Sequence, residues 1–282
     1  MNQISVSIDK IIIEYTKVSM DFWNGYFMKN ICDYYGINPT IHELGFKYQL
    51  HLVNPDGTYM HVSFRPTHES KSKHYSLWIE THPEYLGGFK NILNALNWQS
   101  KDINFVSCEV AYDIPVSPSN VFISSRTGRN MNWNSGTRYF GRRKTSKKSG
   151  YCRVYDKSKE LSERKQQDIK GELTRVEMVY RPDPFDRFSI FDLLSNIPNF
   201  NKLYTCRIID SLEALKPDMK AQVLAVQKGE MTLKEFSPYK RKKIGQALDN
   251  QHLIDFNELA GQNWYKLLVE PIKLIYKARM PF

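Results

Sequence analysis

Two short runs that alternate between polar and apolar residues constrain the fold of this chain more than any other feature. They span residues 151–157 and 172–181. Side chains of a β-strand point alternately to its two faces, so the alternation predicts two strands that each have one polar face. The polar faces would carry Tyr151, Arg153, Tyr155 and Lys157 on the first strand, and Arg175, Glu177 and Val179 on the second.

The first 182 residues combine strand-like with helix-like patterns. Residues 54–58 contain Pro-Asp-Gly between two alternating runs, which predicts a β-hairpin. Residues 104–114 alternate like another strand, whereas residues 83–98 have helical spacing. We therefore predict an α+β fold whose antiparallel-rich central sheet carries helices on one face.

The pattern changes after Pro182 and Pro184, where helical spacing replaces strand alternation. This change predicts two domains, with residues 1–182 forming an α+β catalytic and DNA-binding domain and residues 183–282 forming a helical C-terminal region. Residues 204–215 are among the segments that we expect to be helical.

Positive charge is concentrated in one part of the chain. The formal net charge is +10, and residues 126–165 contain thirteen Lys or Arg but only three Asp or Glu. Aromatic residues lie within this run, and bases can stack on them, so the run favours nucleic acid binding. A solvated flexible loop is the alternative. The candidate DNA-contacting residues are Arg138, Tyr139, Arg142, Arg143, Lys144, Lys147 and Lys148.

A second basic cluster, residues 240–243, has the sequence Lys-Arg-Lys-Lys and lies in a predicted helix. It would either contact the DNA backbone or form a solvated helix face.

Several functional classes are not supported by the sequence. The four cysteines, Cys32, Cys108, Cys152 and Cys206, show no CxxC spacing, so we expect reduced thiols and no zinc site. The N-terminus lacks a signal-peptide pattern, and no apolar run approaches the length of a membrane span. We expect a cytoplasmic protein.

Three carboxylates lie on predicted strands. Glu109 and Asp113 share one face of the strand at 104–114, and Glu177 is on the strand at 172–181. Carboxylates inside a sheet must be paired or bind a cation, and oxygen-only ligands suit Mg²⁺ or Mn²⁺. The alternative is that these acids form structural ion pairs with Arg153 and Arg175.

Tyr155 is the candidate nucleophile on the polar face. A phenol has a pKa near 10, and we expect Arg153, Lys157 and Arg175 to favour its ionised form and to hold a phosphate. A phosphotyrosine ester would conserve bond energy for later rejoining. The alternative is an ordinary aromatic residue on a half-buried strand.

An ordered set of motifs resembles a known family. The chain contains Cys-Glu-Val-Ala-Tyr-Asp at 108–113, Tyr-Phe-Gly-Arg-Arg-Lys-Thr at 139–145, Arg-Val-Tyr-Asp-Lys at 153–157 and Arg-Val-Glu at 175–177. In order and rough spacing they resemble the rolling-circle replication initiators of small plasmids and phages. The resemblance is to the type first known from staphylococcal plasmids, with relatives among transposon relaxases. Glu109, Cys108 and Thr174 stand where the family has Asp, Arg and commonly Trp.

The resemblance implies a metal-dependent endonuclease that nicks one strand at a replication origin and later rejoins it. Tyr155 would stay attached to the 5′ phosphate, assisted by Lys157, Arg153 and Arg175, while Glu109, Asp113 and Glu177 would hold Mg²⁺ or Mn²⁺. The substrate would be origin DNA, single-stranded at the nick. A host helicase and a second copy of the chain are the further partners that it implies. A mobilisation relaxase of an integrative element, or a non-catalytic DNA-binding initiator or repressor, are the alternatives.

Overall fold

The computed structural model describes most of the chain, namely residues 3–41, 48–66, 74–100, 102–141, 148–165, 171–209, 216–228, 230–231, 233–249 and 251–277. The chain divides into two compact units. Unit 1 comprises Met1–Ser7, Val110–Tyr180 and Pro198–Gln262, and unit 2 comprises Ile8–Glu109, Arg181–Ile197 and Asn263–Phe282. This division by compactness differs from the predicted domain boundary after residue 182. Independent folding of residues 1–182 stays a prediction.

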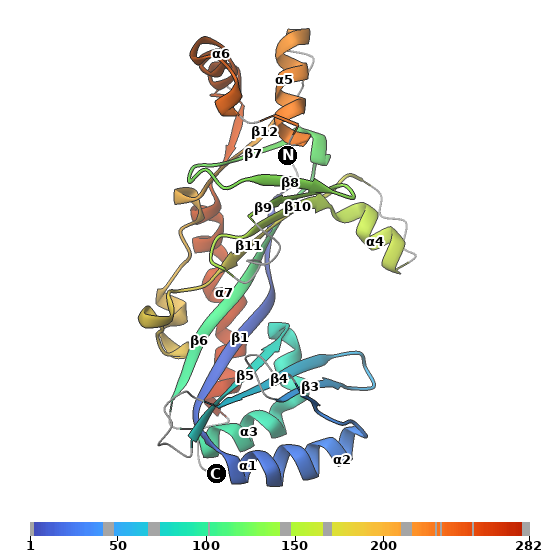
Figure 1. Ribbon diagram of the computed structural model, residues 1–282, viewed down its shortest axis with the longest axis vertical. Coiled ribbons are helices and arrows are strands. Elements are labelled where there is room, and N and C mark those ends of the chain that lie inside the picture. The colour runs from blue at the N-terminus through green and yellow to red at the C-terminus, as the bar shows by residue number, and fades with distance from the viewer. Residues whose placement is uncertain are drawn as a thin grey trace. The chain divides into compact units, whose positions relative to one another are not determined.

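Unit 2 contains an antiparallel sheet with the strand order β2-β3-β4-β5-β1-β6 (Figure 1). The predicted hairpin is confirmed: β3 and β4 pair in register, and the Gly57 N–H donates to the Asn54 carbonyl at 2.9 Å. Gly57 adopts a φ of +82°, which only glycine reaches without strain. The strands are β1 (Ser5–Ser19), β2 (Thr40–Ile41), β3 (Tyr48–Val53), β4 (Tyr59–Pro66), β5 (His74–Thr81) and β6 (Ile103–Ile114).

Helices cover one face of this sheet. The first helical stretch runs from α1 (Met20–Phe22) through a π-helical segment, Trp23–Ile31, to α2 (Cys32–Tyr35). Trp23 stacks on Phe64 of β4, with ring centroids 4.5 Å apart. A 3-10 helix, Pro83–Phe89, leads into α3 (Lys90–Gln99), which buries Ile92, Leu93 and Leu96 on one side, as its spacing predicted. The prediction of an α+β fold is therefore confirmed.

Unit 1 contains the strand order β6-β11-β10-β9-β8, and residues 110–114 of β6 belong to it. The two alternating runs at residues 151–157 and 172–181 form β10 (Cys152–Asp156) and β11 (Thr174–Tyr180), which are antiparallel neighbours. The hairpin of β8 (Met131–Asn134) and β9 (Thr137–Phe140) was not predicted. Its turn residues Ser135 and Gly136 have φ values of +48° and +80°, as a two-residue hairpin turn of this kind requires. Helix α4 (Lys157–Lys165) follows β10 directly.

A smaller sheet of unit 1 has the order β13-β12-β7, formed by β7 (Val121–Ser125), β12 (Tyr204–Ile208) and β13 (His252–Ile254). The expectation of a helix over residues 204–215 is wrong for β12. Tyr204, Cys206 and Ile208 are buried and alternate with less buried neighbours, which is the period of a strand. Residues 210–215 lie outside the described residues.

Helices α5 (Pro217–Lys228) and α6 (Pro238–Asp249) pack beside this small sheet through a shared apolar cluster. Both helices were predicted, as was α7 (Phe256–Lys277). The apolar cluster shared by α5, α6 and the small sheet consists of Phe122, Ile209, Val223, Phe236, Ile244 and Leu248.

None of the helices in the described ranges is long and apolar enough to cross a membrane. The remaining 3-10 helices are Pro118–Asn120, Pro184–Asp186, Ile190–Ser195, Phe200–Lys202 and Leu233–Glu235.

Candidate active site

The register of β10 and β11 places four polar side chains on one face of the sheet in unit 1. Arg153 pairs with Glu177 across the two strands, and Tyr155 pairs with Arg175. Paired residues of antiparallel strands point to the same face, so the predicted polar face is confirmed for these four residues. The prediction is wrong for the other three, because Tyr151 and Val179 are buried and Lys157 begins helix α4. The opposite face is apolar and carries the fully buried side chains of Cys152, Val154, Val176 and Met178.

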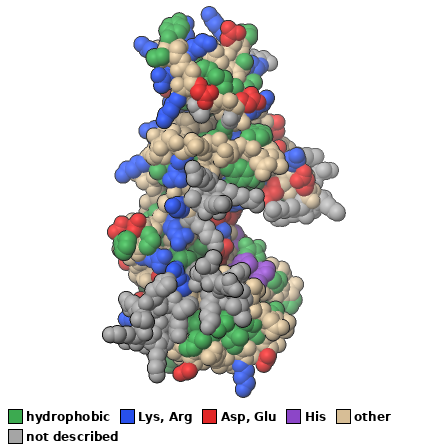
Figure 2. All heavy atoms as spheres, in the orientation of Figure 1, with side chains coloured by type: hydrophobic (Ala, Val, Ile, Leu, Met, Phe, Trp, Pro, Cys, Tyr) green, Lys and Arg blue, Asp and Glu red, His purple; other side chains and the backbone are tan. Residues whose placement is uncertain are grey.

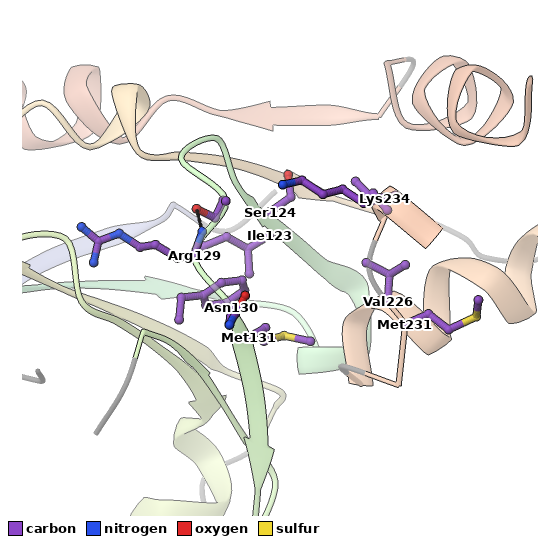
Figure 3. Close-up of a pocket in the computed structure, with 12 residues that line it drawn as sticks. Ile123, Ser124, Arg129, Asn130, Met131, Val226, Met231 and Lys234 are labelled. Carbon is purple, nitrogen blue, oxygen red and sulfur yellow. Dashed lines mark hydrogen bonds between the residues drawn. The ribbon is translucent and has the colours of Figure 1, made fainter. Parts of the chain in front are cut away.

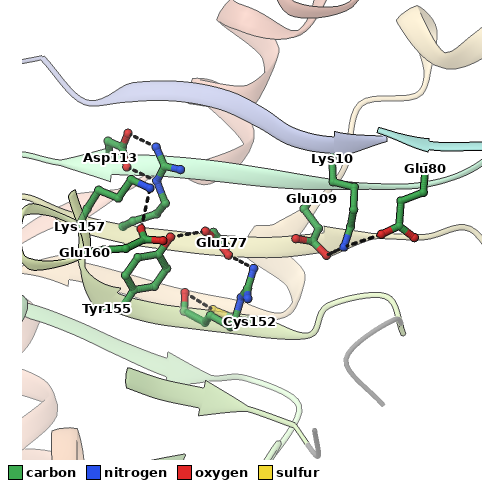
Figure 4. A network of polar contacts seen from close by, with 11 residues as sticks. Lys10, Glu80, Glu109, Asp113, Cys152, Tyr155, Lys157, Glu160 and Glu177 are labelled. Carbon is green, nitrogen blue, oxygen red and sulfur yellow. Dashed lines mark hydrogen bonds and ion pairs between the residues drawn. The ribbon is translucent and has the colours of Figure 1, made fainter. Parts of the chain in front are cut away.

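Tyr155 and Arg153 both bind the carboxylate of Glu177 (Figure 4). The Tyr155 hydroxyl donates to Oε1 of Glu177 at 2.5 Å, and Nη2 of Arg153 forms an ion pair with Oε2. The Glu177 side chain is only 6% exposed, whereas that of Arg153 is 40% exposed. A buried carboxylate needs such compensation. Here a phenol meets one oxygen and a guanidinium meets the other.

The surroundings of Tyr155 favour its neutral form. Burial raises the pKa of Tyr155 above its ordinary value, and the negative charge of Glu177 together with the hydrogen bond to it raises this pKa further. The guanidinium of Arg175 acts in the opposite direction, with a smaller effect. The expectation that cations favour the ionised phenol is therefore wrong for this arrangement. A nucleophilic Tyr155 would need a base, and Glu177 already accepts its hydrogen bond.

Arg175 is fixed by Asp113 of β6. Its Nε and Nη2 donate to the two oxygens of the Asp113 carboxylate, both at 2.6 Å. Both side chains are largely buried, and a two-point contact of this kind restricts both side chains to one geometry. This pair holds Arg175 next to Tyr155 in the cross-strand register.

The end of β10 positions Lys157 close to Tyr155. The Asp156 carboxylate accepts the N–H of Lys159 at 2.9 Å and so caps α4. Lys157 begins this helix. Its Nζ lies 5.9 Å from the centre of the Tyr155 ring and donates to Glu160 at 2.7 Å. Glu160 was missed in the sequence, although its position three residues after Lys157 on a charged helix was a usable signal.

Glu109 belongs to unit 2 and takes part in a different network. Nζ of Lys10 lies 2.6 Å from Glu109 and 3.4 Å from Glu80 (Figure 4). Although burial lowers the pKa of Lys10, these two carboxylates raise it above its ordinary value. Glu109 therefore has a cation partner that the sequence did not reveal.

The described residues do not fit the expected Mg²⁺ or Mn²⁺ site. Carboxylates are suitable ligands for either ion, but no group of three metal-ligating side chains comes together within the described part of the chain. Arg153 forms an ion pair with Glu177, and Arg175 forms one with Asp113. Each of the three expected ligands, Glu109, Asp113 and Glu177, is instead in an ion pair. For Asp113 and Glu177 the partners are the arginines that the alternative interpretation of the sequence named.

The expected DNA-contacting residues have different positions. Arg138 is 2% exposed, and its guanidinium donates to the carbonyls of Val121 and Pro118 at 2.8 and 3.1 Å. A phosphate cannot reach it there, so the expectation for Arg138 is corrected. Tyr139 is half-buried beside Arg153, and Lys148 is exposed. Arg142, Arg143, Lys144 and Lys147 lie outside the described residues.

The basic cluster of residues 240–243 lies on α6, where its side chains are exposed. Figure 2 shows Lys and Arg side chains over this helix. Lys243 contacts the ring of Tyr239, with Nζ 5.0 Å from the ring centre. The cluster is thus a solvated helix face that keeps its charge available, and a contact with the DNA backbone stays a prediction.

A pocket of about 320 Å³ in unit 1 is separate from this site (Figure 3). Met131 and Phe140 line it from the β8–β9 hairpin, and Met231 and Leu233 line it from the connection between α5 and α6. Phe140 pairs with Cys152 in the register, so it points to the apolar face of the sheet. The pocket therefore opens on the face opposite Tyr155.

Comparison with known proteins gives likenesses among solved structures only. No protein-family model matches the chain, and no curated protein matches it. The structure is similar to that of the Rolling Circle Replication Initiator Protein from Geobacillus stearothermophilus, with 13% sequence identity and a TM-score of 0.36. The match covers 88% of this chain and 97% of that chain.

Proposed function

We propose that this protein is a DNA nicking and joining enzyme that starts rolling-circle replication, with Tyr155 as its nucleophile. One observation carries the proposal: the Tyr155 hydroxyl donates to a buried carboxylate, Glu177, on a face that also presents a partly exposed arginine. The ordered motifs at residues 108–113, 139–145, 153–157 and 175–177 support the choice of reaction.

The arrangement suits a general-base mechanism. Oη of Tyr155 attacks the phosphorus of the scissile phosphodiester, and its proton passes to Oε1 of Glu177. The bond between phosphorus and the 3′ oxygen breaks, and the leaving oxygen takes a proton from the Lys157 ammonium. The products are a 5′-phosphotyrosine ester and a free 3′ hydroxyl. Rejoining is the reverse reaction, in which a 3′ hydroxyl attacks the ester and Tyr155 leaves.

The two arginines have different roles in this proposal. Arg153 is the more exposed of the two, so it binds the phosphate oxygens while it keeps Glu177 charged. Arg175 is held by Asp113 and acts as a positioning residue, because it fixes the strand opposite Tyr155. Lys148 contributes a backbone contact outside the reacting centre.

Dependence on Mg²⁺ or Mn²⁺ is a separate proposal that rests on the resemblance alone, because the described carboxylates are held in ion pairs and do not form a metal site. It is tested by titrating Mn²⁺ into the DNA-free protein in a calorimeter, comparing wild type with Glu177→Gln. We expect weaker binding in the variant. Unchanged binding would remove Glu177 from the ligand set. Recruitment of a host helicase and pairing with a second copy also stay proposals of this kind.

The test of the function uses a randomised library of single-stranded oligonucleotides, because the origin sequence is unknown. The full-length protein is incubated with the library and Mn²⁺, and covalent adducts are isolated under denaturing conditions. We expect a peptide that contains Tyr155 to carry the nucleotide, as peptide mass spectrometry would show. An adduct on another residue would reject the assignment of Tyr155 as the nucleophile. Retained DNA without any adduct would identify a DNA-binding protein without this chemistry. Sequencing of the trapped DNA would give the nick site.

A further inference from the structure

A row of side chains leads from the candidate active site to the edge of the sheet in unit 1. Glu177 of β11 pairs with Arg153 of β10, Arg153 pairs with Tyr139 of β9, and Tyr139 pairs with Asn132 of β8. Directly paired residues share a face and are close neighbours. Tyr139 and Asn132 therefore continue the face of Tyr155 outward, and β8 is the last strand in the order.

The two faces of the β8–β9 hairpin have different chemistry. The outward continuation of the Tyr155 face consists of Asn132, Asn134, Thr137 and Tyr139, which the register pairs with one another. None of these side chains is charged, although the chain has a formal net charge of +10. The opposite face carries Met131, Trp133, Arg138 and Phe140, and two of these, Arg138 and Phe140, are buried.

Uncharged polar side chains next to the candidate active site are better suited to binding nucleic acid bases than to binding phosphates. A phenol ring offers a stacking surface to any base, and a carboxamide both donates to and accepts from a base edge. Phosphates are bound chiefly by Lys and Arg, and neither residue occurs on this side of the hairpin. The row thus has the groups that contact the bases of a single strand.

The side-chain carboxamides of Asn132 and Asn134 differ in their hydrogen bonding. The Asn134 side chain accepts the hydroxyl of Ser135 at 3.1 Å. Asn132 is exposed, and its side chain has no hydrogen-bond partner in the described part of the chain. Its donor and acceptor groups are accordingly open to a ligand, and its partner across the two strands is Tyr139.

We propose that single-stranded DNA crosses this face from β10 to β8, with one base stacked on Tyr139 and the next base bound by the carboxamide of Asn132. The proposal rests on the proposed function for the identity of the ligand, and it assigns Asn132 a part in base preference. The scissile phosphate lies over Arg153 and Tyr155, so the two bases flank the nick on one side.

Photocrosslinking tests the position of the bases without requiring catalysis. Full-length Tyr155→Phe protein is mixed with 20-nucleotide single strands of randomised sequence that contain one 5-iodouracil, and the complexes are irradiated. We expect the crosslinked peptide to contain Tyr139, and we expect Tyr139→Leu to lose most of the crosslink. Trp133, which is 48% exposed on the other face of the same hairpin, provides the control. Crosslinking to Trp133 or outside the hairpin would overturn the proposal.

Selection from the same library tests Asn132. Sequencing of the bound fraction is expected to show a preference at one base position, and Asn132→Ala is expected to reduce that preference about tenfold. Asn134→Ala is the matched control, and we expect it to keep the preference. Equal preference in wild type and Asn132→Ala would reject the role of Asn132.

Different outcomes would reject the nicking function and the base contacts of Tyr139 and Asn132. Crosslinks at Tyr139 without a covalent adduct on wild-type Tyr155 would retain the base row and reject the nicking function. An adduct on Tyr155 together with crosslinks elsewhere would retain the nicking function and reject the base row. Circular dichroism of each variant verifies that a lost signal reflects lost contact and not unfolding.

Discussion

Each unit contains a buried glutamate on a strand, and the two residues have different partners. Glu14 of β1 in unit 2 accepts from the Ser76 hydroxyl at 2.5 Å, the Trp78 indole at 2.9 Å and the Arg187 guanidinium at 2.8 Å. Glu177 in unit 1 accepts from the Tyr155 phenol and pairs with Arg153. Both residues are less than 9% exposed.

The two glutamates differ in whether a hydrogen-bond donor can transfer its proton to the carboxylate. A serine hydroxyl, an indole and a guanidinium keep their protons at ordinary pH, so Glu14 is held in a static network. A phenol is a weak acid that can give its proton to the carboxylate as it attacks an electrophile. Burial and charge pairing are common to both glutamates, so the proposed reactivity of Glu177 depends on its phenol partner, Tyr155.

The strongest test of this comparison is Tyr155→Phe. This variant keeps the ring but removes the hydroxyl, so we expect complete loss of covalent adduct with single-stranded DNA. Binding should be retained, because Arg153 and Lys148 are unchanged. Adduct formation is measured on denaturing gels and binding by fluorescence anisotropy. Cleavage at the wild-type rate by Tyr155→Phe would show that Glu177 is as static as Glu14.

Glu177→Gln should have the next largest effect on activity. The carboxamide can still contact the phenol but is a far weaker base, so we expect the rate of adduct formation to fall by a factor of about 10² to 10⁴. The rate is measured in single-turnover reactions, with folding monitored by circular dichroism. The matched variant is Glu14→Gln, whose rate per folded molecule should equal that of wild type. Similar losses in both variants would abolish the distinction between the two glutamates.

Glu14→Gln should instead reduce stability. Arg187 would lose its charge partner in a buried setting, and we expect the free energy of unfolding to fall by about 3 kcal/mol. Urea denaturation at neutral pH measures this change. A variant as stable as wild type would show that the Glu14 network is dispensable.

Glu14 also makes the stability of the protein depend on pH. Although burial raises it, the hydrogen bonds from Ser76 and Trp78 and the charge of Arg187 bring the pKa of Glu14 below its ordinary value. A carboxylate with a lowered pKa contributes stability that is present above its unfolded value of about 4.3 and is lost as the pH falls through the folded value. Wild type should therefore lose more stability than Glu14→Gln between about pH 5 and pH 3. Parallel losses in the two proteins would contradict this assignment.

The smallest expected effect concerns Lys148. Affinity for single-stranded DNA should decrease with salt because bound cations displace counterions from phosphates, and each contact contributes roughly 0.7 to the logarithmic slope. Lys148→Ala should lower the slope by about that amount. The control is Lys266→Ala, an exposed lysine of α7. Equal slopes for all three proteins would remove Lys148 from the interface.

The sequence predicted the polar face of β10 and β11 because both strands bury one apolar face, which makes their alternation regular. The hairpin of β8 and β9 escaped notice because its strands have four residues each and Asn132 and Asn134 are poor strand formers. The strand β12 was taken for a helix, since five residues with alternating burial are too few to distinguish from a helical face.

Side-chain partners were predicted less well than strands. The sequence of the basic run, residues 126–165, does not show that Arg138 is buried. Its burial depends on a contact between its long side chain and the backbone carbonyl of Val121, which the folded structure alone provides. The pKa of Tyr155 is raised by burial and by the carboxylate of Glu177, and only the folded structure shows that these influences act on the phenol together. The Lys10 partner of Glu109 lies 99 positions away in the chain, beyond the reach of any local pattern.

The junction between β10 and α4 imposes a constraint on length. Tyr155 precedes Asp156, which ends the strand and caps the helix through Lys159. Deleting one residue within 152–154 would leave the cap in place but shift the paired register by one position, which turns alternate side chains to the opposite side. Homologous proteins should therefore tolerate changes of residue type in this segment more readily than insertions or deletions.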